Sequence, residues 1–201
     1  NVKTRGTWGE VQLASLLEQL LVPEQYAANV APVPGSNERV EFAIRLPGRG
    51  DDAPVWLPID AKFPREDYER LVIAQEKADP VAAEAAARQL EQRLRLEAKT
   101  IRTKYVSPPD TTDFALMFLP TEGLYAEVVR RPGLMDDLQR SWRVVVAGPS
   151  TLAAILSSLQ MGFRTLAVEK RSSEVWQLLG AVKTEFGKFG DVLAKTKEQI
   201  D

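Results

Sequence analysis

The chain has 201 residues, of which 44% are hydrophobic and 27% charged, and these proportions exclude a disordered segment. It contains neither cysteine nor histidine, so disulfides, thiolate nucleophiles, zinc sites built on Cys or His, and Ser-His-Asp catalysis are excluded. A net charge of −2 excludes a uniformly basic coat for nucleic acid, although a local basic patch remains open. Catalysis would therefore depend on carboxylates, Lys, Arg, Tyr, Ser or Thr, and a metal would be a hard cation such as Mg²⁺ or Mn²⁺.

No apolar run reaches the roughly 18 residues of a membrane span, and no signal peptide is recognisable, which predicts a cytoplasmic protein. The sequence begins at Asn1 and ends in a polar helical pattern. We therefore expect a piece of a longer protein.

The N-terminal part predicts one helix and a strand. Leucines at helical spacing predict a helix over residues 8–21, which Pro23 ends. Thr7 and Glu10 fit a capping box at its start. A weaker pattern over residues 25–33 predicts a first strand.

Two alternating segments then predict an antiparallel hairpin. Residues 40–46 and 55–63 alternate between apolar and polar side chains, and the Gly- and Pro-rich loop 47–54 joins them. Pro58 lacks an N–H, so we expect a bulge or an unpaired position there.

Helices and buried strands alternate over the remainder of the chain. The patterns predict helices over 66–78, 80–104, 121–130, 134–140, 151–159 and most of 163–200, with strands over 114–119 and 144–147. Glycines 180, 187 and 190 are expected to kink the last helix. This order predicts an α/β fold with a mixed sheet flanked by helices, in which 1–160 form the core and 161–201 a helical extension packed on it.

Three polar residues of the hairpin form a candidate site. Asp60 and Lys62 are two residues apart and share one face of their strand, and Glu41 lies on the polar face of its neighbour. Two carboxylates at one point repel unless a cation lies between them. A divalent metal would lower the pKa of a water and polarise a phosphodiester, with Lys62 orienting the water or stabilising developing charge.

The simpler alternative is that these residues form only the solvated face of a strand. Against it, Ala43, Trp56 and Pro58 share that face, so it is expected to be partly covered. A covered Asp and Lys need partners. Glu10 is a fourth candidate, but spacing alone favours its capping-box role.

Other polar residues offer binding surfaces. Arg88, Arg95, Lys99 and Arg102 fall near one helical face and Lys104 follows, a stripe suited to a phosphate backbone or simply to solvent. Glu122 and Tyr125 follow a buried strand, where they would face a cleft or cap a helix. Lys104-Tyr105 and Arg164 are further polar candidates without independent support.

Several segments resemble the RmuC family of bacterial DNA recombination proteins. They are Arg5-Gly-Thr-Trp-Gly-Glu10, Leu57-Pro-Ile-Asp-Ala-Lys-Phe-Pro64, Lys104-Tyr105 with Pro108-Pro109, Asp113-Phe-Ala-Leu-Met-Phe-Leu-Pro-Thr-Glu-Gly-Leu-Tyr125, Gln160-Met-Gly-Phe-Arg164 and Glu185-Phe-Gly-Lys-Phe189. They follow one another in a consistent order along almost the whole chain.

The resemblance implies a place in the PD-(D/E)xK nuclease superfamily, with a restriction-endonuclease-like α-β-β-β-α-β core. The metal-binding acids and the lysine of that superfamily fall on Glu41, Asp60 and Lys62. A helical acid often joins them, which reverses the reading of Glu10 and makes it a further ligand. The first acid is usually an Asp after Pro, whereas Val40-Glu41 stands here, so the metal position is expected to shift.

The resemblance also implies a DNA partner, Mg²⁺ or Mn²⁺ as cofactor, and a membrane anchor or coiled coil in a preceding segment. Three hypotheses stay open: a metal-dependent deoxyribonuclease that limits DNA rearrangement, a catalytically weak DNA-binding or scaffolding module, and a helical partner-binding domain. The substrate structure, the cleavage polarity and any self-association do not follow from the sequence.

Overall fold

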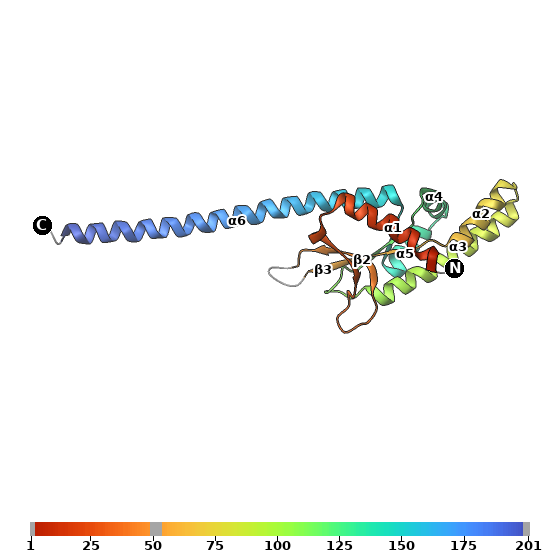
Figure 1. The fold of residues 1–201 in the computed structure, drawn as a ribbon, viewed down its shortest axis with the longest axis horizontal. Coiled ribbons are helices and arrows are strands. Elements are labelled where there is room, and N and C mark those ends of the chain that lie inside the picture. The colour runs from red at the N-terminus through yellow and green to blue at the C-terminus, as the bar shows by residue number, and fades with distance from the viewer. Residues whose placement is uncertain (1–2, 49–53, 199–201) are drawn as a thin grey trace. The chain divides into compact units, whose positions relative to one another are not determined.

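The computed structural model describes residues 3–48 and 54–198, and these form a mixed α/β structure (Figure 1). The elements in chain order are α1 (Lys3–Leu20), η1 (Pro23–Gln25), β1 (Tyr26–Val30), β2 (Val40–Leu46), β3 (Val55–Ala61), α2 (Arg65–Glu76), α3 (Pro80–Tyr105), β4 (Ala115–Phe118), α4 (Glu122–Arg130), α5 (Leu134–Trp142), β5 (Val144–Ala147) and α6 (Pro149–Glu198). The predicted fold class, a mixed sheet flanked by helices, is confirmed at this level.

The strands form one five-stranded sheet in the order β1-β2-β3-β4-β5. The first three strands are antiparallel, as the predicted hairpin requires, while β4 runs parallel to β3 and β5 parallel to β4. The β2–β3 register runs from Leu46 opposite Val55 to Phe42 opposite Ile59. One more step of this register places Glu41 opposite Asp60, on the same side of the sheet.

Side chains alternate between the two faces of the sheet along each strand, so apolar residues pack in a layer on each face. The first layer joins α3 and α5 to alternate strand residues, including Ala43, Met117 and Val146. Leu13 of α1 and Leu152 of α6 are also fully buried but lie outside that cluster. The Asp60 side of β3 therefore faces the layer that contains α3, because Pro58 and Asp60 share the side of Ala43.

Helix α1 begins earlier than the sequence predicts. It starts at Lys3, so Thr7 lies inside the helix. An N-cap residue has non-helical backbone angles, which a residue in the second turn of a helix does not have. The capping box of Thr7 and Glu10 is therefore wrong, and this leaves the Glu10 carboxylate without its assigned capping role.

Pro58 causes no bulge, because the β2–β3 register passes through Ala43 opposite Pro58 without interruption. The N–H of Trp56 points towards the chain preceding β4, where it donates to Asp110. Pro58 is two residues after Trp56, so its backbone nitrogen points to the same edge of β3 as that of Trp56. This position comes one residue before β3 begins to pair with β4 at Ile59. The missing N–H thus falls in a gap of the ladder, as the predicted unpaired position requires.

Helix α6 is one uninterrupted helix, so the glycines of its second half do not end it. The chain divides into two compact units, 1–157 and 158–201, and α6 belongs to both. In the second unit Met161 and Leu178 are 70% and 66% exposed. By length and composition alone the stretch Pro149–Ala181 could cross a membrane, but one such helix is weak evidence for a span.

Candidate active site

The ladder between β2 and β3 ends where the candidate site begins. Beyond the Phe42–Ile59 pair, the backbone N–H of Ala61 donates to Glu41 Oε2 at 2.8 Å. On the other side of β3, the N–H of Lys62 donates to the Phe118 carbonyl at 2.9 Å. The Glu41 carboxylate is therefore fixed at the end of β3, beside Asp60.

Asp60 is buried against α3 and paired with one cation. Its residue is 2% exposed, and Lys62 Nζ lies 2.7 Å from its Oδ2. The contact is close but poorly directed, since Asp60 Oδ2 has no hydrogen bond of acceptable geometry. A buried carboxylate with an incompletely satisfied oxygen carries a large desolvation penalty, which a further cation or proton would relieve.

Glu41 titrates near neutral pH. Burial is the main cause that raises its pKa to about 7, and the negative charge of Asp60 adds to the shift. The hydrogen bond from Ala61 and the charge of Lys62 oppose it. The site therefore resists holding two carboxylate charges at once, as expected for two acids that share one cation or one proton.

Lys62 is surrounded by acids. Burial alone lowers its pKa, but Asp60, then Glu97 and Glu41, raise it above the ordinary lysine value. Glu97 Oε2 of α3 lies 3.9 Å from Lys62 Nζ. Burial raises the pKa of Asp60, and Lys62 opposes that shift. Lys62 is thus a charged ammonium that bridges β3 and α3.

Glu10 extends this group from α1. Gly9 lies against Ala61 and Pro120, where an added Cβ would come within 3.6 Å of the Ala61 Cβ. This packing brings the half-buried Glu10 close enough for its charge to raise the pKa of Glu41. The structure therefore gathers Glu41, Asp60, Lys62 and Glu10 in one region, while their catalytic roles stay predictions.

The donor chemistry fits a hard divalent cation. Carboxylate oxygens are the ligands that Mg²⁺ and Mn²⁺ prefer, and Asp60 Oδ2 is a buried carboxylate oxygen without a well-directed hydrogen bond. Among the described residues no three acidic side chains converge tightly enough to form a ready-made cage. Glu41 and Asp60, at adjoining strand ends, could therefore hold such a cation, and the ligand role of Glu10 stays a prediction.

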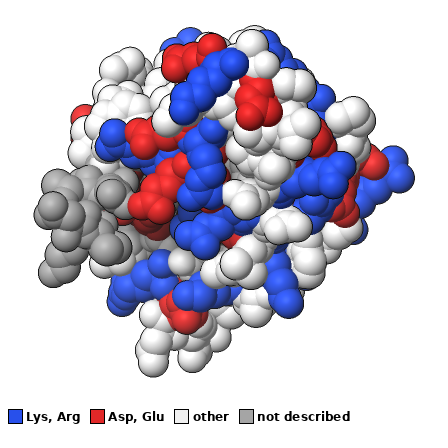
Figure 2. Space-filling view, turned by 90° about the vertical axis from the view of Figure 1, so that its right-hand side faces the viewer, with Lys and Arg blue, Asp and Glu red and all other residues white. Residues whose placement is uncertain are grey.

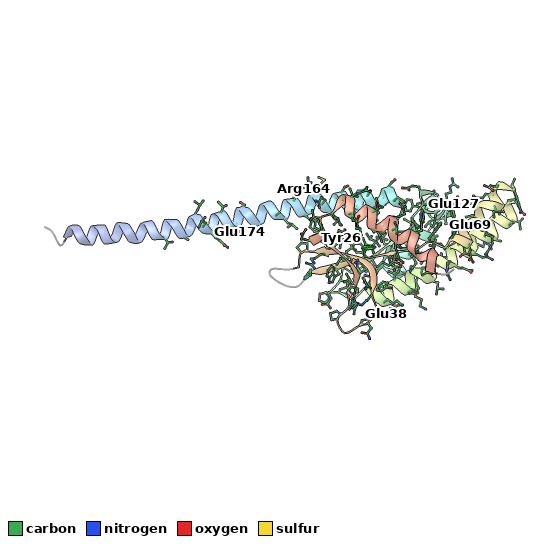
Figure 3. The ribbon with its side chains drawn as sticks, viewed as in Figure 1. Tyr26, Glu38, Glu69, Glu127, Arg164 and Glu174 are labelled. Carbon is green, nitrogen blue, oxygen red and sulfur yellow. The ribbon has the colours of Figure 1, made fainter. Side chains whose placement is uncertain are left out.

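The basic residues predicted to bind DNA are engaged within the protein. Arg88 pairs with Glu84, and Lys104 pairs with Glu38, which is labelled in Figure 3. Arg95 bridges Glu91 and Asp137. Lys99 lies 5.9 Å from the centre of the Trp142 ring, and Arg102 donates to the Val106 carbonyl.

Positive and negative side chains are interspersed over the face of the molecule shown in Figure 2. Together with the ion pairs along α3, this reduces the free charge of the basic stripe. DNA binding by the stripe remains a prediction.

The other cleft candidates differ in their surroundings. Glu122 Oε1 accepts a hydrogen bond from the N–H of Ser150 at 2.6 Å, so it caps the start of α6. Tyr125 is partly buried against the first apolar layer and lies against Gly148. Arg164 is exposed on α6 in the second unit (Figure 3).

Two further residues lie near Asp60: Glu97, which no sequence pattern singled out, and Tyr105, a polar candidate of the sequence without an assigned role. Glu97 contacts Lys62, and Tyr105 is 8% exposed, with a pKa raised by burial and then by Asp60. Glu97 also pairs with Arg93 one helical turn away, which from sequence indicates an ordinary surface pair. In the structure, α3 buries its apolar positions against the sheet, and this packing brings Glu97 to the site.

Fold and site together define an α/β protein with a buried acid–lysine pair at the end of a central strand. The family model of the RmuC family matches residues 1–201, so the chain belongs to the RmuC family. The family resemblance noted from the sequence segments is thereby confirmed.

Curated relatives named DNA recombination protein RmuC homolog are similar over most of this chain. The Xylella fastidiosa (strain Temecula1) protein is 64% identical over 202 residues, which cover 100% of this chain and 44% of that protein. The Chlamydia muridarum protein is 31% identical over 87% of this chain and 39% of its own length. The Pseudomonas aeruginosa protein is 27% identical over 99% of this chain and 44% of its own length.

The chain thus spans less than half the length of the curated relatives it matches. No solved structure matches it.

Proposed function

We propose that this chain is the catalytic part of a Mg²⁺- or Mn²⁺-dependent deoxyribonuclease that limits DNA rearrangement. The observation that carries the proposal is the buried Asp60 whose Oδ2 contacts Lys62 at 2.7 Å beside Glu41, a second acid with a pKa of about 7. Perturbed acids next to a lysine at the end of a strand are typical of catalytic sites.

The order of elements supports a PD-(D/E)xK, restriction-endonuclease-like core. A helix precedes three antiparallel strands, two helices follow, and β4 then joins β3 in parallel. The acids and the lysine lie at the adjoining ends of β2 and β3, where the superfamily places them. This likeness of architecture is an analogy, and the site itself carries the functional argument.

Each residue of the site has a distinct task in phosphodiester hydrolysis. Glu41 and Asp60 would hold the cation, which when bound polarises a phosphodiester and makes water more acidic. Lys62, held by Asp60 and Glu97, would orient the attacking water or stabilise the charge that develops on the phosphate oxygens. Glu10 would act further from the cation, through its effect on Glu41.

The test combines cleavage with metal binding. Hairpin, branched and linear DNA would be incubated with Mg²⁺ or Mn²⁺, and metal affinity would be measured by titration calorimetry. We expect Asp60→Asn to lose metal binding and cleavage together, because an amide is a poor ligand for a hard cation. We expect Lys62→Ala to lose at least about 100-fold in cleavage but to keep or gain metal affinity.

Two controls keep this experiment interpretable. Asp113→Asn removes a carboxylate that is 68% exposed and should leave both readouts unchanged. Lys62→Ala leaves Asp60 buried without its cation, so Lys62→Met, which preserves the apolar stem, and a thermal melt accompany it. Parent-like cleavage by Lys62→Ala, with the fold intact, would contradict the mechanism.

A catalytically weak DNA-binding or scaffolding module is the second candidate. The contact of Lys62 Nζ with Asp60 Oδ2 at 2.7 Å favours it, because the ammonium compensates the buried charge of Asp60 without a metal. Metal-independent DNA binding without cleavage of any of the three DNA forms would make it the better account.

A further inference from the structure

An aromatic pair, exposed Trp8 and half-buried Phe63, lies beside the candidate active site. The rings of Trp8 and Phe63 have centroids 5.4 Å apart and are tilted by 42°. Trp8 belongs to α1, two residues before Glu10, and Phe63 follows Lys62 in the chain. Trp8 is 43% exposed, so a large part of its surface remains available beyond the contact with Phe63.

A hollow adjoins the Phe63 ring. It encloses about 480 Å³, including its open mouth, and is lined by Phe63, Pro64, Arg65, Glu66, Asp67 and Arg93. The lining carries two guanidinium groups and two carboxylates, so net charge does not draw in a simple anion. Arg65 pairs with Glu69 and Arg93 with Glu97, but both arginine side chains are more than half exposed, so their remaining N–H groups can donate to an anionic group such as a phosphate.

A chain of ion pairs links the hollow to the candidate active site. Arg93 Nε lies 3.3 Å from Glu97 Oε1, and Glu97 Oε2 lies 3.9 Å from Lys62 Nζ. The Arg93 side chain is 52% exposed, so its guanidinium reaches the hollow while it remains tied to Glu97. A phosphate bound by Arg93 would therefore be a neighbour of a phosphate bound at Lys62 along one strand.

We propose that Trp8, Phe63 and the Arg93 side of this hollow bind an unpaired nucleotide next to the cleaved phosphate, so that the substrate is single-stranded or locally melted DNA. This inference rests on the proposed function in one respect, because it takes Asp60 and Lys62 as the residues at which the phosphodiester is cleaved. Base faces stack on exposed aromatic rings, and cations beside the rings follow the backbone. Bases in an intact duplex are stacked on each other and cannot offer this face.

The test measures binding without cleavage. A fluorescent thymidine oligonucleotide and a duplex of equal length would be titrated with the protein in Ca²⁺ and in EDTA. We expect Trp8→Ala to weaken single-strand binding by about 5- to 100-fold, the range for loss of one base–aromatic stack, and duplex binding by less than about twofold. Trp8→Phe, which keeps a ring, should retain most of the affinity.

Controls separate stacking from folding and from charge. Val11→Ala changes another exposed residue of α1, 60% exposed, and should alter neither titration. Arg93→Ala should weaken single-strand binding and flatten its salt dependence, whereas Arg140→Ala, whose side chain is 80% exposed on α5, should not. Thermal melts establish that each variant is folded.

The outcomes distinguish this inference from the nuclease proposal. Equal losses for both DNA forms, no loss in Trp8→Ala, or a loss in Trp8→Phe as large as in Trp8→Ala would overturn the nucleotide site. Trp8-dependent single-strand binding by a parent that cleaves nothing would support the nucleotide site and count against the nuclease. If cleavage depends on Asp60 but single-strand binding is unchanged in Trp8→Ala, the nuclease proposal is supported and the nucleotide site is overturned.

Discussion

Glu41 is a half-buried acid whose protonation state should affect stability at neutral pH. Its pKa rises from 4.5 in a free side chain to about 7, first through burial and then through Asp60. Between these two values the folded protein binds more protons than the unfolded chain. The free energy of unfolding therefore falls as pH rises through this window, and the loss is complete above about pH 7.

Glu41→Gln should remove this pH dependence in the metal-free protein. The neutral amide can still accept the hydrogen bond from Ala61, so it resembles the protonated acid. In urea titrations with EDTA we expect parent and variant to be similar at pH 4, and the variant to be more stable by roughly 1–3 kcal/mol at pH 8. Glu24→Gln, at an exposed acid of η1, is the control, and a constant difference across pH would contradict the assignment.

Two glycines should respond in opposite directions to the same substitution. A Cβ on Gly148 would lie 2.9 Å from Tyr125 Cβ and 3.1 Å from Glu122 Oε2, whereas a Cβ on Gly162 meets nothing within 4 Å. We expect Gly148→Ala to destabilise by about 1–3 kcal/mol, because the turn into α6 must shift. Gly162→Ala should be neutral or stabilise by up to about 1 kcal/mol, because alanine favours a helix. Urea midpoints at fixed m-value measure both.

Helix α3 is held to the C-terminal half of the core by arginines as well as by its apolar face. Arg131, between α4 and α5, contacts Glu84 at 2.8 Å and Glu91 at 2.9 Å. Arg140 makes an ion pair within α5 at a side chain that is 80% exposed.

Loss of Arg131 should therefore matter more than loss of Arg140. We expect Arg131→Ala to destabilise by roughly 1 kcal/mol, which for a chain of this size lowers the melting temperature by about 2–4 °C. Arg140→Ala should leave the melting temperature unchanged. High salt should reduce the difference between the two variants, because screening weakens exposed pairs. Equal effects of both substitutions would argue against a bridging role for Arg131.

Most elements could be predicted because their cues are local. Alternation defined β2 and β3, apolar runs defined β4 and β5, and Pro80 marked the start of α3, where Asp79 caps the helix. The start of α1 could not be predicted, because the Thr7–Glu10 pattern imitates a cap inside a longer helix. The segment from Lys3 to Gly6, which is already helical, carries no comparable signal.

The residues of the site that lie on paired strands could be predicted from the sequence, and the contribution of the helix could not. The period of two placed Asp60 and Lys62 on one face, and the hairpin register brought Glu41 opposite. The contribution of α3 depends on how a helix crosses the sheet, and no local pattern encodes that crossing. Glu97 therefore emerged only from the packed structure, and Tyr105, a polar candidate of the sequence, is placed near Asp60 only there.

At the scale of the whole molecule, the chain consists of a folded core and the long end of α6. The compact unit that ends at Ser157 already includes Leu152 and Leu156, which are fully buried. Beyond it, Val175 and Leu179 are 55% and 52% exposed. The buried leucines explain why the first turns of α6 belong to the core, and in the second unit Val175 and Leu179 leave apolar surface exposed.

A chain that ends after residue 160 should therefore unfold with nearly the same midpoint as the full chain. It keeps both buried leucines, whereas Leu156→Ala in the full chain creates a cavity and should cost about 2–5 kcal/mol. A chain that ends after residue 150 loses both leucines and should not fold. Urea and thermal unfolding of the four proteins would measure this order. A marked loss of stability on removing residues 161–201 alone would mean that the extension packs on the core, as the sequence predicted, and that its apolar residues help to stabilise the sheet.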